Sequence, residues 1–108
     1  MRARSIAEAM REHFLDHPVR VTYTGRMTTS RAGTHQYIGG VHKVNLCRAG
    51  ETVETLLHEL AHALQKQRGE RTPGNMHGAG FERAHREVKA WYAEHYKEHY
   101  GEQVEERK

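Results

Sequence analysis

The stretch that decides the fold covers residues 53–64 and reads Val53-Glu54-Thr55-Leu56-Leu57-His58-Glu59-Leu60-Ala61-His62-Ala63-Leu64. Its apolar residues recur at the period of an amphipathic α-helix. We predict a helix from residue 52 to about residue 67, with Gly69 as its C-terminal stop. Because each helical residue advances by about 100°, His58 and His62 fall on a different face from the apolar stripe. One face of this helix can therefore pack on the core while another opens to a cleft.

His58, Glu59 and His62 form the pattern H-E-x-x-H, which indicates a specific chemistry. Residues four apart on a helix lie about 6 Å from each other on one face, so two imidazoles can bind one Zn²⁺ at about 2.0–2.1 Å per bond. Glu59 follows the first histidine, so its carboxylate reaches the metal-bound water rather than the metal. Zinc lowers the pKa of that water to about 7, and the glutamate takes its proton as general base. The motif predicts a single catalytic zinc ion in a hydrolase.

A third protein ligand is needed, because a catalytic zinc ion usually has three and keeps one position open. The metzincin pattern fails, since Gln65 and Arg68 stand where it requires glycine and histidine. We favour His77, because the neighbouring Gly78 and Gly80 allow the sharp backbone path that returns a loop side chain to a helix. The alternatives that stay open on the next helix are His85, Glu82 and Glu87.

The chain before this helix predicts one helix and three short strands. Residues 5–16 read as a helix that begins with a capping box of Ser5 and Glu8. Residues 19–24, 34–38 and 41–46 read as strands, and Gly39-Gly40 between the last two predicts a hairpin turn.

The chain after the motif predicts a loop and a second long helix. Residues 71–80 are rich in glycine, and residues 81–100 carry a helical apolar face. On that face Trp91, Tyr92 and Tyr96 are expected to pack in the core, whereas His95 and His99 are expected to be solvated or packed at its edge. The predicted class is α+β, with a three-stranded sheet, an N-terminal helix, the H-E-x-x-H helix and a long C-terminal helix.

Length and composition limit the possible classes of protein. The 108 residues fit one domain, 1–108, with a charged tail from about residue 101. The net charge of +3 is compatible with weak association with nucleic acid, but does not demonstrate it.

Cys47 is the only cysteine, so it forms no internal disulfide and no four-cysteine zinc site, and we expect it to be buried. With no signal peptide and no apolar spanning run, we expect a cytoplasmic protein with no membrane partner. Nothing in the sequence indicates the oligomeric state.

The run of residues 53–64, followed by His77-Gly78-Ala79-Gly80-Phe81, resembles the SprT-like metalloprotease domain. That family pairs H-E-x-x-H with a later H-G-x-x-F, whose histidine is the third zinc ligand. The resemblance implies a zincin-like minimal metalloprotease core, with a small sheet packed on the active-site helix. Eukaryotic relatives cleave proteins crosslinked to DNA, but this chain lacks the cysteine-rich zinc ribbon and the long DNA-binding tail of longer members. This departure bears on a DNA-linked role and not on the hydrolytic chemistry, so we expect a zinc-dependent metalloendopeptidase that acts on a protein or peptide substrate, including DNA-associated proteins.

The sequence also offers candidates for the substrate-binding strand and for the oxyanion donor of such a site. If the zincin geometry holds, an edge strand beside the cleft accepts the substrate as an added strand, and Val41–Leu46 is the candidate. The donor that stabilises the oxyanion could be Tyr37, His42, His85 or an arginine.

Two other functions compete with this interpretation. One is a gluzincin-like regulatory protease that cuts a repressor, with Glu82 or Glu87 as its third ligand. The other is a non-catalytic module that binds DNA or protein and uses zinc only for folding.

Overall fold

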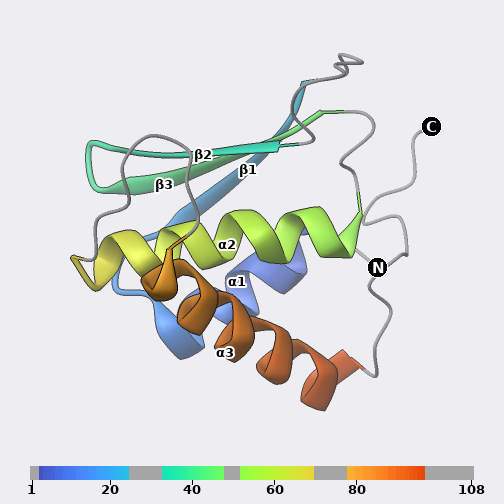
Figure 1. The fold of residues 1–108 in the computed structure, drawn as a ribbon. Coiled ribbons are helices and arrows are strands. Elements are labelled where there is room, and N and C mark those ends of the chain that lie inside the picture. Colours follow the sequence, from blue (N-terminus) through green and yellow to red (C-terminus); the bar gives the residue numbers. More distant parts are fainter. Residues whose placement is uncertain (1–2, 25–32, 48–51, 70–77, 97–108) are drawn as a thin grey trace.

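The computed structural model describes residues 3–24, 33–47, 52–69 and 78–96 and shows a small α+β architecture of the predicted class (Figure 1). The charged tail from residue 101 lies outside the described residues. The elements, in chain order, are α1 (Ala3–Phe14), β1 (Val19–Tyr23), β2 (Gly33–Ile38), β3 (Val41–Leu46), α2 (Val53–Gln67) and α3 (Ala79–Tyr96).

Helix α2 lies at the centre of the molecule. The sheet covers one side of it through β2 and β3, and helices α1 and α3 pack on the other side (Figure 1). The Thr52 hydroxyl caps its N-terminus by accepting from the Thr55 N–H at 3.3 Å, and Gly69 follows its C-terminus with a φ of 73°. The predicted bounds of this helix are thus confirmed.

The three strands form one sheet in the order β1-β3-β2. Strands β2 and β3 pair antiparallel across a turn formed by Gly39 and Gly40, whose φ values of 60° and 78° suit glycine. This confirms the predicted hairpin. Strand β1 pairs parallel to β3, with Val21 opposite Val44.

The strand order corrects one expectation from the sequence. Val41–Leu46, the predicted edge strand, is the central strand, because β1 and β2 pair with it on its two sides. Its burial alternates residue by residue, with His42, Val44 and Leu46 turned into the core. Among the described strands, the edges of the sheet are therefore β1 and β2, and β2 packs on α2.

The hydrophobic core lies between the sheet and the helices. Burial of each large apolar side chain contributes about 1.5–3 kcal/mol. Helix α1 already includes Ala3, so Ser5 is an exposed residue inside the helix and the predicted capping box at its start is wrong. The predicted burial of Cys47, Trp91 and Tyr92 is confirmed. The fully buried core side chains include Ile6, Met10, Val44, Leu46, Val53, Leu56, Leu57, Leu60, Val88 and Tyr92.

Among the described residues, no helix combines the length and the apolar character that a membrane span requires.

Candidate metal centre

The two histidines of the motif lie side by side on α2. The ring centroids of His58 and His62 are 5.0 Å apart, and the ring planes meet at 74°. Both side chains are half-buried, whereas Leu57 and Leu60 on the core side of the helix are fully buried. The helix therefore presents two imidazoles together on a face that is distinct from its apolar stripe, as the periodicity predicts.

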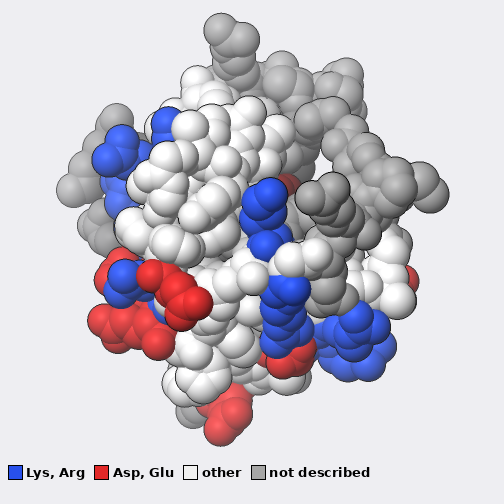
Figure 2. Space-filling model, turned by 90° about the vertical axis from the view of Figure 1, so that its left-hand side faces the viewer, with Lys and Arg blue, Asp and Glu red and all other residues white. Residues whose placement is uncertain are grey.

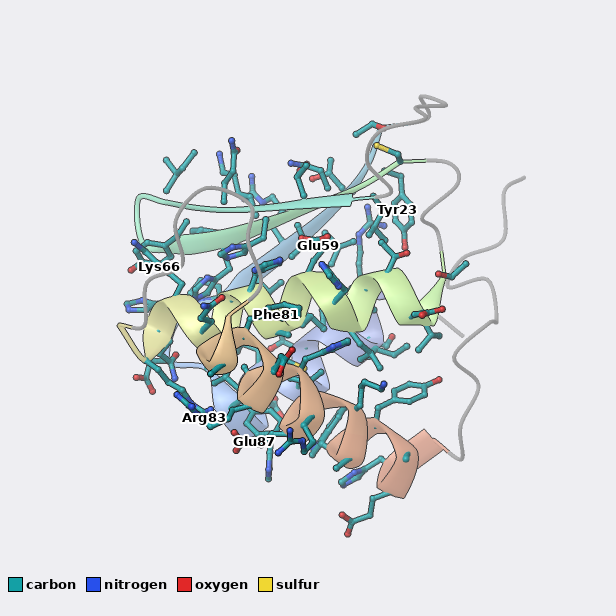
Figure 3. All side chains as sticks on the ribbon, in the orientation of Figure 1. Tyr23, Glu59, Lys66, Phe81, Arg83 and Glu87 are labelled. Atoms are coloured by element: carbon teal, nitrogen blue, oxygen red, sulfur yellow. The ribbon has the colours of Figure 1, made fainter. Side chains whose placement is uncertain are left out.

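The ring of Phe81, near the start of α3, packs against both histidines. Its centroid lies 4.4 Å from that of His62 and 4.9 Å from that of His58, and the side chain is only 3% exposed. Figure 3 shows Phe81 where α3 meets α2. Because this contact restricts the rotamers of both imidazoles, α3 holds the pair in place from outside the helix that carries it.

A third imidazole lies beside this group. The ring centroid of His85 is 5.6 Å from that of His58 and 5.2 Å from that of Phe81. His85 is half-buried and comes from α3, one helical turn after Phe81. Of the histidines and the tyrosine that the sequence offered as oxyanion donors, this is the one that contacts a residue of the H-E-x-x-H pair.

Glu59 points from α2 toward the sheet (Figure 3) and is 5% exposed. A Cβ atom at Gly33 of β2 would lie only 3.3 Å from the Glu59 Cγ atom, so the strand passes very close to this side chain. The Glu59 side chain thus lies in a confined space between α2 and β2, and it directly follows His58 in the sequence. Such an arrangement can bind a cation through the imidazoles and move a proton through the carboxylate.

The favoured third ligand, His77, lies outside the described residues. The described chain resumes at Gly78, whose carbonyl accepts the N–H of Glu82 at 3.0 Å. Within the ranges that the structure describes, no three His, Cys, Asp or Glu side chains form a group that could hold a metal ion. The structure therefore brings together two of the three predicted ligands and the predicted base.

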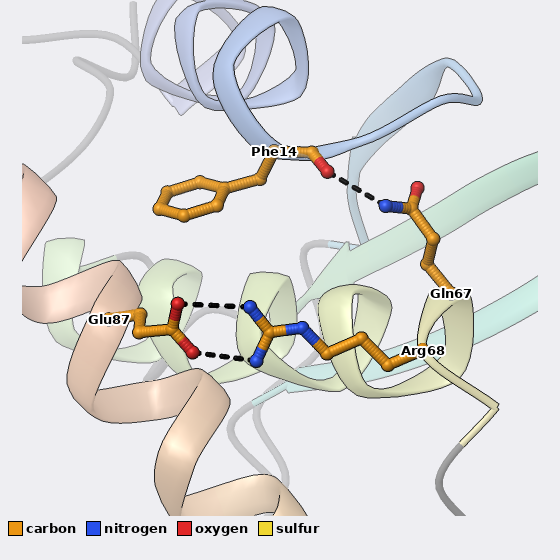
Figure 4. Close-up of polar contacts among 4 residues, drawn as sticks. All are labelled: Phe14, Gln67, Arg68 and Glu87. Atoms are coloured by element: carbon orange, nitrogen blue, oxygen red, sulfur yellow. Dashed lines mark hydrogen bonds and ion pairs between the residues drawn. The ribbon is translucent and has the colours of Figure 1, made fainter.

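Among the described residues, neither carboxylate offered as an alternative ligand forms a metal-binding group with the two imidazoles. Glu82 is exposed, and Glu87 forms two hydrogen bonds with the Arg68 guanidinium at 2.6 and 3.0 Å (Figure 4). The hydrogen bond from Arg68 lowers the pKa of Glu87. The preceding residue, Gln67, donates to the Phe14 carbonyl at 2.8 Å. The end of α2 is thus tied to α1 and α3, and the structure assigns Glu87 to this tie.

A second pair of histidines lies on the sheet, and sequence reasoning missed it. His35 Nε2 of β2 and His42 Nδ1 of β3 are 3.0 Å apart, and His42 is only 1% exposed. Burial, followed by the positive charge of nearby groups, lowers the pKa of each histidine to about 4. Both are therefore neutral at neutral pH. The alternation of β2 and β3 around the Gly39-Gly40 turn was the signal that could have placed them on one face.

This pairing removes one of the oxyanion candidates. His42 is buried in the central strand, so it is not available to a substrate. Tyr37 lies farther along β2, where the Lys66 ammonium is 6.0 Å from its ring centroid. Lys66 follows His62 by one helical turn, so Tyr37 lies beside the end of α2 rather than beside His58.

Helix α2 carries two adjacent imidazoles, and the buried Glu59 beside them faces the edge strand β2. This arrangement is a candidate metal centre of the kind found in metallohydrolases. The chain belongs to the SprT-like family, whose family model matches residues 3–103. The match spans every helix and strand described above and confirms the resemblance seen in the sequence. Membership indicates a metalloprotease-like domain in a family that is typically associated with zinc. No curated protein and no solved structure matched the chain in the corresponding comparisons.

Proposed function

We propose that this protein is a zinc-dependent metalloendopeptidase of SprT-like type with a zincin-like core. Its single Zn²⁺ is held by His58, His62 and His77, and Glu59 is the general base. The observation that carries the proposal is the imidazole pair on α2, with ring centroids 5.0 Å apart and both rings packed against Phe81. Family membership supports the same chemistry.

The donor set suits zinc. Imidazole nitrogens are preferred zinc ligands, and His58 and His62 have the spacing that lets two of them bind one ion. His77 directly precedes Gly78, and Phe81, three residues after that glycine, lies against both imidazoles. The described start of α3 therefore leads the chain toward the pair, which supports His77 as the third ligand.

Glu59 supplies the proton transfer. Zinc, when bound, provides a Lewis acid that lowers the pKa of a water molecule to about 7. The Glu59 carboxylate accepts a proton from the attacking water at an Oε atom and delivers it to the leaving amine nitrogen. Its burial favours this role, because few competing water molecules surround the carboxylate.

The substrate strand adds to β2, which is an edge strand of the described sheet and lies next to α2. In a hairpin with a two-residue turn, the pair flanking the turn is hydrogen-bonded, here Ile38 and Val41. Alternate residues of β2 therefore direct their backbone N–H and C=O groups away from β3, and these are Gly33, His35 and Tyr37. An extended peptide can pair with them and pass beside Glu59.

We propose that the substrates are proteins or peptides in the cytoplasm, with DNA-associated proteins among them. Association with nucleic acid through the basic surface would be weak. The face that carries the β2–β3 turn and the C-terminal end of α2 shows Lys and Arg together with Asp and Glu (Figure 2). Mixed charge of this kind gives little net attraction to a polyanion.

Substitution of Glu59→Gln tests the proposal. The variant should bind as much zinc as the wild-type protein and lose at least about a hundredfold in kcat on an unfolded protein substrate. Glu54→Gln, an exposed position on the same helix, is the matched control and should leave kcat unchanged. Unchanged hydrolysis by Glu59→Gln would refute the assigned base. A zinc-bound wild-type protein with no activity on unfolded protein would favour a non-catalytic module instead.

A further inference from the structure

Gly33, the first residue of β2, stands where the edge strand comes closest to Glu59. A Cβ atom built at this position would meet three neighbours at 3.1–3.3 Å: Asn45 O, Thr55 Cγ2 and Glu59 Cγ. The oxygen belongs to the central strand and the two carbon atoms belong to α2. The position is therefore enclosed by the sheet on one side and by the helix that carries the candidate site on the other.

Glycine is needed here for space and not for backbone conformation. Gly39, Gly40 and Gly69 have φ values of 60°, 78° and 73°, a region that disfavours residues with a side chain. Gly33 is not among the positive-φ glycines and has an extended strand conformation. An alanine could adopt the backbone of Gly33, but its methyl group would press on the three surrounding atoms.

The three neighbours differ in how easily they move. Asn45 O is a backbone atom of a strand paired on both sides, and Thr55 is in the first turn of α2, where its N–H and hydroxyl bond to Thr52. Glu59 Cγ is a side-chain atom that rotation about the Cα–Cβ bond moves, so it can shift where a paired backbone oxygen cannot. A methyl group at position 33 would therefore be accommodated mainly by displacement of the Glu59 side chain.

We propose that Gly33 is a positioning residue for Glu59, and that its missing side chain sets the place of the carboxylate between β2 and α2. The proposal deepens the function proposed above and rests on it for its catalytic consequence. A displaced carboxylate no longer meets the attacking water in line, whereas the imidazoles of His58 and His62 keep their places. The loss should then appear in kcat and not in zinc binding.

The experiment compares Gly33→Ala with Gly40→Ala in the full-length, zinc-bound protein. Position 40 is the matched control, because its φ of 78° strains an alanine but a Cβ there meets nothing within 4 Å. Melting temperature, zinc stoichiometry, kcat and KM on a peptide substrate, and the ¹³Cγ chemical shift of Glu59 in the zinc-free protein are measured for each. If Gly33→Ala folds poorly, the double variant Gly33→Ala/Thr55→Ser removes the Cγ2 contact and keeps the hydroxyl.

Gly33→Ala should keep its zinc and its KM, lose about ten- to a hundredfold in kcat and change the Glu59 resonance. Gly40→Ala should lose thermal stability with kcat and the resonance unchanged. A Gly33→Ala protein with wild-type kcat and an unshifted Glu59 resonance would overturn the proposal. If the zinc-bound wild-type protein is inactive, the proposed function fails, and the resonance still decides whether position 33 places Glu59.

Discussion

The ring of Phe81 lies 4.4 Å from the ring of His62, centroid to centroid, so a side chain on α3 fixes a candidate metal ligand on α2. The same ring lies 4.9 Å from His58. The candidate metal centre therefore depends on the packing of two helices, and not only on the local spacing within one of them. Removal of this ring should affect metal affinity and stability together.

Phe81→Leu should weaken zinc binding by about tenfold or more, because residues that support metal ligands typically contribute that much. Phe81→Ala should in addition lower the free energy of unfolding by about 3–5 kcal/mol. Competition with a chromogenic chelator and urea unfolding measure the two effects. Val88→Ala, a fully buried position on the same helix, is the control that destabilises without changing zinc affinity. Equal zinc affinity in Phe81→Leu and the wild-type protein would contradict the role of the ring.

The ion pair between Arg68 and Glu87 should stabilise the packing of α2 on α3 only modestly. The Arg68 and Glu87 side chains are 33% and 47% exposed, so solvent screening limits the contribution to about 0.3–1 kcal/mol. Because the pKa of Glu87 is lowered, this contribution is present above the unfolded pKa and is lost as the pH falls through the folded value. Urea unfolding of Glu87→Gln and of the wild-type protein should show a larger difference at neutral pH than at pH 3.

Glu94→Gln, at an exposed position on α3, is the control for the ion pair. Zinc content of Glu87→Gln adds a second readout, and it should be unchanged. Loss of zinc from this variant would contradict the arrangement and favour the gluzincin-like alternative.

The half-buried His35 and the buried His42 should together make the protein less stable in mild acid. The unfolded chain takes up these protons near pH 6.5, whereas the folded protein takes them up near pH 4. Between these values the unfolded state binds more protons, so stability falls as the pH falls. Since a change of one unit in pKa corresponds to about 1.4 kcal/mol, the loss should amount to a few kcal/mol across this range.

Urea unfolding in the presence of a chelator measures this loss without interference from zinc release. The double variant His35→Gln/His42→Gln should show a flatter profile between pH 6.5 and pH 4 than the wild-type protein. His95→Gln, which removes a histidine of α3 outside this pair, is the control variant. A wild-type protein whose stability is constant across this range would contradict the neutral pair.

Addition of a substrate strand to β2 is tested at His35, whose backbone groups face the open edge. His35→Pro removes an outward N–H, and an edge strand tolerates proline better than a central one. His35→Ala is the matched control, because both variants lose the contact with His42. We expect KM for a peptide substrate to rise about tenfold more in His35→Pro than in His35→Ala. Equal KM values in the two variants would argue against pairing along this edge.

The parts of the fold that depend on local sequence could be predicted. The period of residues 53–64 defined α2, and the spacing of His58 and His62 placed both imidazoles on one of its faces. The Gly39-Gly40 turn defined the hairpin, because positive φ at both positions is a local requirement. The family resemblance was carried by two short motifs and is confirmed over residues 3–103.

The parts that depend on contacts between distant segments could not be predicted. The parallel pairing of β1 with β3 turned the expected edge strand into the central one, and nothing within residues 41–46 indicates that pairing. The close approach of Gly33 to Glu59 and the pairing of His35 with His42 are also tertiary contacts. They become visible only once the sheet lies on α2.

Calorimetric titration of the purified, metal-free protein with Zn²⁺ shows whether His58, His62 and His77 together hold a zinc ion. We predict that the wild-type chain binds one zinc ion and that alanine at any of the three positions abolishes or strongly weakens this binding. A wild-type protein that takes up no zinc would contradict the proposed zinc site. Undiminished binding by His77→Ala would leave the pair on α2 but remove the proposed third ligand.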